Sequence, residues 1–333
     1  MIVNSRELAI QLDGAWLHRV PVYIEGNPGV GKSNNVEQAR ARRQALVGQP
    51  VGMLDLRLSQ RDATDFIGIP DTSGEFTTWK MPDFWPTSGC GVIFLDEINQ
   101  GSQLVQAASY QLVLDRRLGK YIVPPGWVIW AAGNKQTDRA IVNKMGSALR
   151  SRFIQYELSV DHGAWEEWAL RAGVHMDVIA YLRWQPAHLH DFDPMRDDKV
   201  FACPRTWEMV SKVMQALGTS LPAISGCVGD AKAASFVGFV RIKDDLPVLK
   251  KVIASPKTAD VPDDKPNVCF AISTALAKMA TAANLDAILT YMMRFKRKDF
   301  AALAVKLIVR DHPELQKTAA FIDWAAANSE RIV

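Results

Sequence analysis

Short apolar runs alternate with amphipathic stretches along the first half of the chain. The stretches at 5–18, 32–45 and 102–114 have the spacing of apolar positions expected of helices, the first with Ser5 in the N-cap position. Strands that alternate with helices are joined by crossover connections, so this pattern predicts a parallel sheet flanked by helices. We expect five strands, at 20–25, 51–58, 91–95, 127–132 and 153–158.

The second half of the chain has a different pattern, with helical periodicity and no strand signals after residue 160. A polar, proline-containing stretch at 255–266 is typical of a linker. We therefore expect an α/β domain at 1–160, a helical lid at 161–252 and a C-terminal helical bundle at 253–333. The helices are expected at 164–171, 176–184, 205–216, 230–243, 268–283, 285–295, 299–309 and 313–328.

Two segments interrupt the alternation in the first domain. Residues 62–86 contain β-branched and aromatic residues bounded by Ser-Gly and Pro, which predicts a short hairpin inserted near a helix. Exposed aromatic side chains there could grip a polymer, or they could be packing residues, and the pattern leaves both interpretations open. Residues 116–126 predict a second hairpin.

Composition describes an ordinary soluble protein. Of the 333 residues, 48% are hydrophobic and 23% charged, and the net charge of +3 is too small to argue for a nucleic-acid partner. The four cysteines lack metal-ligand spacing, so we expect reduced thiols and no zinc. Neither a secretory leader nor a long apolar run is evident, which predicts a cytoplasmic protein without a membrane partner.

The first candidate for chemistry is a glycine-rich loop directly after the first expected strand. Residues 26–33 read Gly-Asn-Pro-Gly-Val-Gly-Lys-Ser, the pattern G-x-x-x-x-G-K-S of phosphate-binding loops. Glycines let the backbone turn tightly and point its N–H groups at a polyphosphate. A simple glycine turn is the alternative, but the flanking strand and helix supply the context that the phosphate-binding motif requires.

Acidic and amide side chains follow two later strands. Asp96 and Glu97 end an apolar run, and Asn134 follows the next strand after Gly133. The carboxyl ends of parallel strands meet at one edge of the sheet, so these groups should lie near the phosphate-binding loop. There Asp96 could hold Mg²⁺, Glu97 could polarise a water, and Asn134 could hydrogen-bond the γ-phosphate.

These motifs stand in an order that resembles the AAA+ ATPases. After the loop, the carboxylates and Asn134 come Arg-Ser-Arg-Phe at 150–153 and Cys-Pro-Arg at 203–205. The sequence Asp-Glu-Ile-Asn at 96–99 and the two hairpins are similar to the MoxR-like branch. The resemblance covers about residues 18–243 and implies a P-loop AAA+ core with a helical lid; the C-terminal bundle has no matching motif.

The resemblance implies a role for each motif residue, with ATP and Mg²⁺ as cofactors. Asp96 and Ser33 would bind the metal, Glu97 would be the catalytic glutamate and Asn134 sensor 1. Arg152, with Arg150 as second candidate, would be an arginine finger, and Arg205 would be sensor 2. The ATP-binding loop would comprise Gly26, Asn27, Pro28, Gly29, Val30, Gly31, Lys32 and Ser33.

The resemblance also implies a hexameric ring in which Arg152 acts on the ATP of a neighbouring subunit. The expected activity is ATP hydrolysis that remodels a protein client, with a von Willebrand factor A-type adaptor as partner. A nucleic-acid motor of the restriction or helicase kind is the alternative, against which the near-neutral charge stands. A third possibility, a nucleotide-gated scaffold with little turnover, is disfavoured by Glu97.

Overall fold

The computed structural model describes residues 1–135, 145–244, 248–263 and 265–327. Contacts divide the chain into two compact units. The first comprises Met1–Ala164 and Phe192–Asp197, and the second comprises Trp165–Asp191 and Asp198–Val333. The expected division into an α/β domain, a lid and a C-terminal extension stays a prediction.

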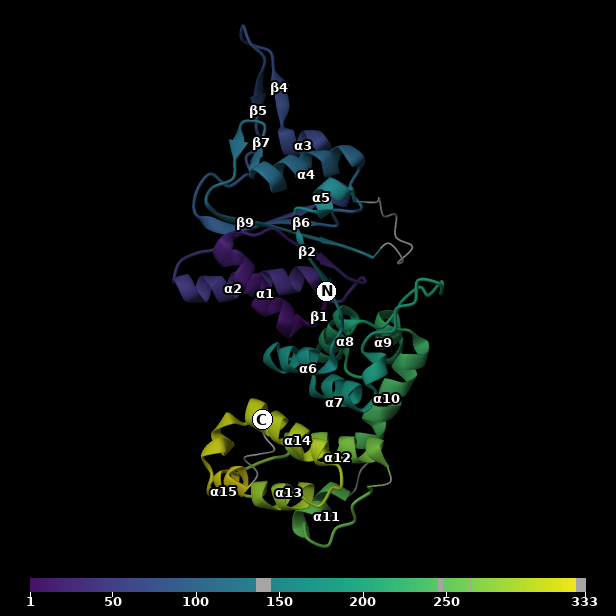
Figure 1. Cartoon of the computed structure of the whole chain (residues 1–333). Helices are drawn as coiled ribbons and strands as arrows, with labels where there is room; N and C mark the ends of the chain where they lie inside the picture. The colour runs from purple at the N-terminus through teal and green to yellow at the C-terminus, as the bar shows by residue number, and fades with distance from the viewer. Residues whose placement is uncertain (136–144, 245–247, 264, 328–333) are drawn as a thin grey trace. The chain divides into compact units, whose positions relative to one another are not determined.

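The first unit is built on a parallel sheet of six strands in the order β1-β10-β2-β9-β6-β3 (Figure 1). The α/β fold class is confirmed, and the sheet has one strand more than the five expected. The additional strand is β1, which is only two residues long and hydrogen-bonds to β10 at the edge. The strands are Ile2–Val3 (β1), Val22–Glu25 (β2), Gly52–Arg57 (β3), Cys90–Asp96 (β6), Gly126–Gly133 (β9) and Ile154–Leu158 (β10).

Helices cover both faces of this sheet, as Figure 1 shows. One core lies under α1 and α2 and receives Val92 and Phe94 from β6. The other lies under α4 and receives Ile93 and Leu95 from the same strand. This alternation explains why β6 is apolar throughout, since both of its faces are buried. The helices are Ser5–His18 (α1), Lys32–Val47 (α2), Gln103–Asp115 (α4) and the short Ser147–Arg150 (α5).

Helix α1 spans the expected residues, but its N-cap lies one residue earlier than expected. Its N-cap is Asn4 and not Ser5, because the Asn4 side chain accepts hydrogen bonds from the backbone N–H groups of Arg6 and Glu7. The Glu7 carboxylate in turn accepts from the Asn4 N–H, which completes a capping box.

Both expected hairpins are present. The first follows α3 (Ala63–Ile67) and pairs β4 (Ile69–Asp71) with β5 (Thr78–Lys80), and the second pairs β7 (Arg117–Leu118) with β8 (Tyr121–Ile122). Some aromatic residues of the first insert are packing residues, and others are exposed. Phe66 is buried in the core, whereas Phe76 and Trp79 are 75% and 44% exposed.

A single tryptophan fills the space above two glycines in the sheet. Gly52 of β3, Gly91 of β6 and Trp127 of β9 are register neighbours on adjacent strands. A Cβ atom at Gly52 or Gly91 would lie 2.5 or 2.6 Å from atoms of the Trp127 ring. The indole N–H donates to the Ser88 carbonyl at 2.9 Å, so the ring has one defined position across both glycines.

The second unit is helical. Its interior includes an aromatic cluster around Tyr181, which contacts Trp207 and Phe236. None of the helices in the described part of the chain is both long and apolar enough to cross a bilayer. The helices are His162–Arg171 (α6, shared with the first unit), Met176–Trp184 (α7), Pro204–Leu217 (α8), Leu221–Val228 (α9), Asp230–Asp244 (α10), Val248–Ala254 (α11), Pro266–Lys278 (α12), Leu285–Met292 (α13), Lys298–Asp311 (α14) and Ala319–Ala327 (α15).

The segment expected to be a linker is held against the unit by side chains near α13. Arg294 donates to the carbonyls of Pro256 and Ala259, and the Tyr291 hydroxyl donates to the Asp260 carbonyl at 2.7 Å. Ala259 is itself buried. The expected helix at 313–328 is interrupted: a 3-10 turn at Pro313–Lys317 precedes α15, and residue 328 lies outside the described residues.

Candidate nucleotide site

The glycine-rich loop connects the end of β2 to the start of α2. Gly29 and Gly31 have φ values of 77° and 95°, which side chains with a Cβ rarely adopt. Gly31 is the N-cap of α2, so the unpaired N–H groups of the first helical turn face the loop. A loop of this shape at a helix N-terminus suits a polyphosphate.

Packing leaves no room for side chains at the start of this loop. A Cβ at Gly26 would lie 3.0 Å from the Leu158 carbonyl oxygen and 3.2 Å from Val30, whose side chain is buried in the core. Asn27 and Pro28 complete the turn between them. The loop is thus held to β10 on one side and to α2 on the other.

The Lys32 ammonium lies where the loop and the sheet edge meet. It donates to the carbonyls of Gly26 and Asn27 at 2.6 and 3.1 Å. It also donates to the Asn134 side-chain oxygen at 2.8 Å. The structure therefore brings together two predicted site residues that are 102 positions apart in sequence.

A second contact joins the loop to the carboxylates. The Ser33 hydroxyl donates to the Asp96 carboxylate at 2.9 Å, and Asp96 is buried. A hydroxyl and a carboxylate are oxygen ligands of the kind Mg²⁺ prefers. The residues present thus fit a magnesium ion, which Ser33 and Asp96 would hold.

Glu97 stands at a turn immediately after β6. Its φ of 55° is in the left-handed region, and its backbone N–H donates to Asp96 Oδ1 at 2.9 Å. The Ser59 hydroxyl, from the 3-10 turn Leu58–Gln60 after β3, donates a short hydrogen bond to the Glu97 carboxylate. The sequence did not suggest Ser59, because a lone serine after a strand carries no motif.

Asn99 is a second site residue with no role assigned from the sequence. Its side-chain N–H donates to the Asn134 carbonyl oxygen at 2.6 Å. It belongs to the Asp-Glu-Ile-Asn sequence that resembles the MoxR-like branch, which was the available signal. Its contact partner could not be read from spacing alone.

Further charged side chains on β3 lie beside the carboxylates. Arg57 is the register neighbour of Asp96, and Asp55 lies two residues earlier on the same strand face. Burial raises the pKa of the Asp55 carboxyl, and the charges of Asp96 and Glu97 raise it further, while Arg57 opposes them. The carboxylates of Asp55, Asp96 and Glu97 thus gather at this edge, with the Arg57 guanidinium beside them.

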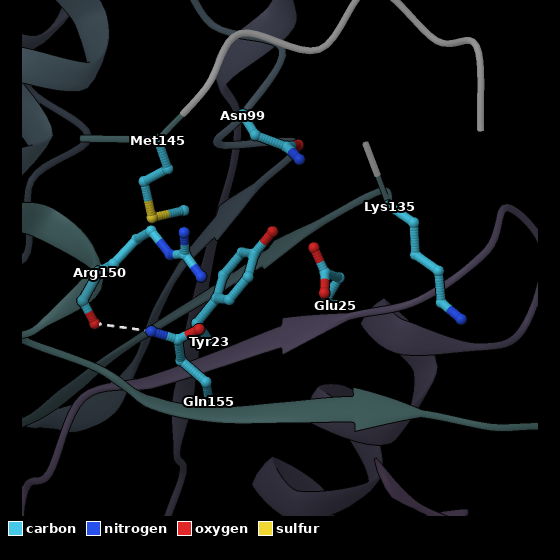
Figure 2. A pocket seen from close by; sticks show the side chains of 7 residues that line it. All are labelled: Tyr23, Glu25, Asn99, Lys135, Met145, Arg150 and Gln155. Carbon is cyan, nitrogen blue, oxygen red and sulfur yellow. Dashed lines mark hydrogen bonds between the residues drawn. The ribbon is translucent and has the colours of Figure 1, made fainter. Parts of the chain in front are cut away.

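A cavity of about 320 Å³ opens at the same edge of the sheet, on the face occupied by α5. Figure 2 shows Tyr23, Asn99 and Arg150 among its lining side chains, with the Arg150 guanidinium turned toward the Tyr23 ring. Burial raises the pKa of the Tyr23 hydroxyl; the charge of Glu25 adds to this effect and that of Arg150 opposes it. Arg150 therefore faces a cavity of its own unit.

The other two predicted arginines are exposed, as Arg150 is. Arg152 follows α5 and precedes β10, and its side chain is exposed. Arg205 is the second residue of α8 in the second unit and is also exposed. The N-terminus of α8 is capped through Thr206, whose hydroxyl accepts from the Cys203 N–H at 2.9 Å.

The geometry defines the class of fold. The loop after β2, the amide after β9 and the carboxylates after β6 lie at the carboxyl ends of three adjacent parallel strands. This is an α/β fold with a parallel sheet covered on both faces and a glycine-rich loop of the phosphate-binding pattern after β2.

Comparisons with known proteins find distant likenesses of fold. No protein-family model and no curated protein matches this chain. Among solved structures, the Thermotoga maritima RuvB Holliday junction branch migration motor is 17% identical, with a TM-score of 0.41 over 75% of this chain and 73% of that one. A putative ATPase from Cytophaga hutchinsonii is 12% identical, with a TM-score of 0.40 over 98% and 89% of the two chains.

A third similar structure is NtrX from Brucella abortus in complex with ADP. It is 12% identical, with a TM-score of 0.41 over 98% of this chain and 67% of that one. These distant likenesses assign no role to any residue of this chain.

Proposed function

We propose that this chain is a magnesium-dependent ATP hydrolase of the AAA+ type. The observation that carries the proposal is the pair of contacts from Lys32 to Asn134 and from Ser33 to Asp96. These contacts gather a phosphate-binding loop, a metal-binding carboxylate and an amide into one site. ATP is proposed over other nucleotides because the resemblance to AAA+ proteins favours adenine.

Each of these residues has a defined task in the proposed reaction. The N–H groups of the loop and the Lys32 ammonium bind the β- and γ-phosphates of the substrate. When bound, Mg²⁺ supplies positive charge to the phosphate oxygens. Glu97 orients and polarises the attacking water, and Asn134 holds the γ-phosphate in line with it. The Ser59 hydrogen bond sets the direction of the Glu97 carboxylate.

We further propose that the chain works as a ring and that Arg152 completes the site of the next subunit. Its exposed side chain supports a role on another molecule; Arg150 is exposed as well, but it lines a cavity of its own unit. Arg205 is proposed as the lid residue that contacts nucleotide.

A protein client, reached through a von Willebrand factor A-type adaptor, is proposed from the MoxR-like resemblance. The net charge of +3 gives no support to a DNA motor.

Two variants test the proposed activity. Lys32→Ala removes the cation that faces the phosphates, so it should lose ATP binding, measured with a fluorescent ATP analogue. Glu97→Gln should bind ATP with unchanged affinity while hydrolysis, measured by phosphate release, falls at least about 100-fold. The control is Lys212→Ala on α8, where the lysine side chain is 70% exposed and pairs with Glu208. Normal turnover by Glu97→Gln would remove Glu97 from its role, and undiminished ATP affinity of Lys32→Ala would refute the site.

A further inference from the structure

The ladder between β6 and β9 is interrupted where the catalytic carboxylate stands. Regular pairing ends at Leu95 and Ala131. Glu97 then turns the chain with its positive φ, and the turn closes with a hydrogen bond from the Gln100 N–H to the Glu97 carbonyl at 2.8 Å. β6 ends at Asp96, and the residues of this turn no longer continue the regular ladder with β9.

Two hydrogen bonds restore the connection between the strands. The Ile98 N–H donates to the Ala132 carbonyl at 3.0 Å. Two residues further along the chain, just after β9, the Asn134 carbonyl accepts from the side-chain amide of Asn99 at 2.6 Å. The Asn99 amide thus replaces the backbone donor that the turn at Glu97 removes.

The direction of the Asn99 amide follows from its partner. A carbonyl oxygen accepts and cannot donate, so the Asn99 side chain must present its NH₂ group to Asn134. The Asn99 side chain is 3% exposed, which shields this bond from water. Its Oδ1 has no hydrogen-bond partner among the described residues.

A glycine makes the position of Asn99 possible. A Cβ at Gly133 would lie 2.5 Å from both Asn99 Oδ1 and the Tyr23 hydroxyl. The backbone just before Asn134 therefore lies directly against the Asn99 side chain. Asn99 contacts the Gly133–Asn134 segment on two sides, through a hydrogen bond and through close packing.

We propose that Asn99 is a positioning residue that holds Asn134 against Lys32 and couples it to Glu97. The connection runs from the turn at Glu97 through the Asn99 amide to the Asn134 backbone, and from the Asn134 side chain to the Lys32 ammonium. Asn99 touches neither nucleotide nor water in this scheme. The inference rests on the proposed ATPase function and adds to it the residue that places Asn134.

The scheme predicts a specific kinetic pattern for Asn99→Ala. ATP affinity should stay within about threefold of wild type, because Lys32 and the loop are intact. The kcat should fall about 10- to 100-fold, as is typical when a supporting hydrogen bond to a reacting group is lost. Asn99→Asp keeps the shape of the side chain but puts an oxygen opposite the Asn134 carbonyl. Its kcat should therefore fall at least as far as that of Asn99→Ala. Gln103→Glu at the exposed start of α4 is the matched amide-to-carboxylate control and should be neutral.

A double-mutant cycle separates positioning from general damage. If Asn99 acts through Asn134, the variant combining Asn99→Ala with Asn134→Ala should have the kcat of Asn134→Ala alone. A multiplicative loss, or a normal kcat for Asn99→Ala, would overturn the inference. Thermal unfolding of each variant shows whether it is folded, and Asn99→Ser replaces any variant that is not.

A second readout keeps the inference separate from the proposed activity. The preference for ATP over ADP depends on Asn134 if this residue meets the γ-phosphate, so Asn99→Ala and Asn134→Ala should lower that preference equally, by no more than about threefold. Absence of hydrolysis by the wild-type protein would reject the ATPase proposal, but the ATP and ADP affinities of these variants would still decide the role of Asn99. An unchanged ATP/ADP preference in Asn99→Ala, beside a lowered preference in Asn134→Ala, would refute the positioning role of Asn99.

Discussion

Glu97 adopts a backbone conformation that an L-residue with a side chain disfavours. A left-handed residue costs about 1–2 kcal/mol relative to ordinary backbone. The surrounding hydrogen bonds offset this cost, namely those from the Glu97 N–H to Asp96 and from Ser59 to the Glu97 carboxylate. Backbone strain of this kind concentrates at sites where a side chain must be presented in one direction. In its proposed role, Glu97 must point its carboxylate at the attacking water, which requires one fixed direction of the side chain.

Asp55 makes the stability of the free protein depend on pH. Its folded pKa is raised, so its charged form is a cost that is absent at acid pH and appears as pH rises through that pKa. Asp55→Asn should therefore raise Tm at neutral pH in the presence of a chelator, by at most about 2 °C because the Asp55 carboxyl is only partly buried and solvent screens its charge. Scanning calorimetry between pH 4 and pH 8, about the range that brackets the carboxyl titration, measures this difference.

Glu37→Gln is the control for this prediction. It removes a carboxylate that pairs with Arg40 on α2, so it should not gain stability as pH rises. A Tm difference between Asp55→Asn and wild type that stays constant across the pH range would contradict the assignment.

At the residue scale, spacing predicted the loop and the strand-end groups because both depend on local rules. A strand followed by glycines, Lys32 and Ser33 needs no knowledge of the rest of the chain, and Asp96 ends an apolar run. Ser59 and the Asn99 contact depend on which strands lie side by side and on the turn at Glu97. No local pattern encodes these contacts, which is why the sequence did not reveal them.

At the scale of elements, helix α1 shows how much a single N-cap contributes to stability. The Asn4 side chain satisfies two N–H groups that would otherwise lack partners at the helix start. Asn4→Ala should lower the free energy of unfolding by about 1 kcal/mol, measured by denaturant titration.

Ser5→Ala distinguishes the cap seen here from the one expected from the sequence. Ser5 makes only a 3.4 Å contact with the Asn35 side chain, so its replacement should cost clearly less than that of Asn4. If Ser5→Ala were the more destabilising of the two, the helix would begin at the position that the sequence suggested.

Elements with strong periodicity and hairpins marked by turn residues could be predicted, whereas the isolated two-residue strand β1 could not. The strand β6 and the helix α7 lie where the apolar pattern placed them. The strand β1 has two residues, too few for any alternation, and forms only because β10 offers it an edge. Ser5 and Asn4 are both good N-caps, and the choice depends on backbone geometry that residue type does not specify.

At the scale of the whole molecule, the proposed ring makes each active site the product of two chains. Arg152→Ala should lower hydrolysis by about 1,000-fold or more, because an arginine finger stabilises transition-state charge. Mixed with Lys32→Ala, it should regain activity, since a site with an intact loop and a neighbouring intact Arg152 can form. Phosphate release across mixing ratios measures this.

Mixing Lys32→Ala with Glu97→Gln is the control. Both residues belong to the same side of one subunit, at the loop and at the end of β6, so no mixed ring contains a complete site. Equal activity in the two mixtures, or none above the separate proteins in the first, would show that Arg152 does not act in trans.

The α/β class and the helical second half followed from the change in periodicity near residue 160. The boundaries of the two compact units did not follow from this change in periodicity. Residues 192–197 belong to the first unit although helical sequence surrounds them, and residues 256–260 are held by Arg294 and Tyr291 although their composition is that of a linker. Such long-range attachments depend on side chains far away in the sequence, which local composition does not register.

The tryptophan that lies across Gly52 and Gly91 has a consequence for how these positions can change during evolution. A side chain can appear at Gly52 only in a lineage where Trp127 has already become smaller, and a smaller residue at 127 leaves an empty space that favours the reverse change. Gly91 is constrained twice, because a Cβ there would also lie 2.5 Å from the Gly52 carbonyl oxygen, which a smaller residue at 127 does not remove. Positions 52 and 127 should therefore change together, whereas position 91 should remain glycine.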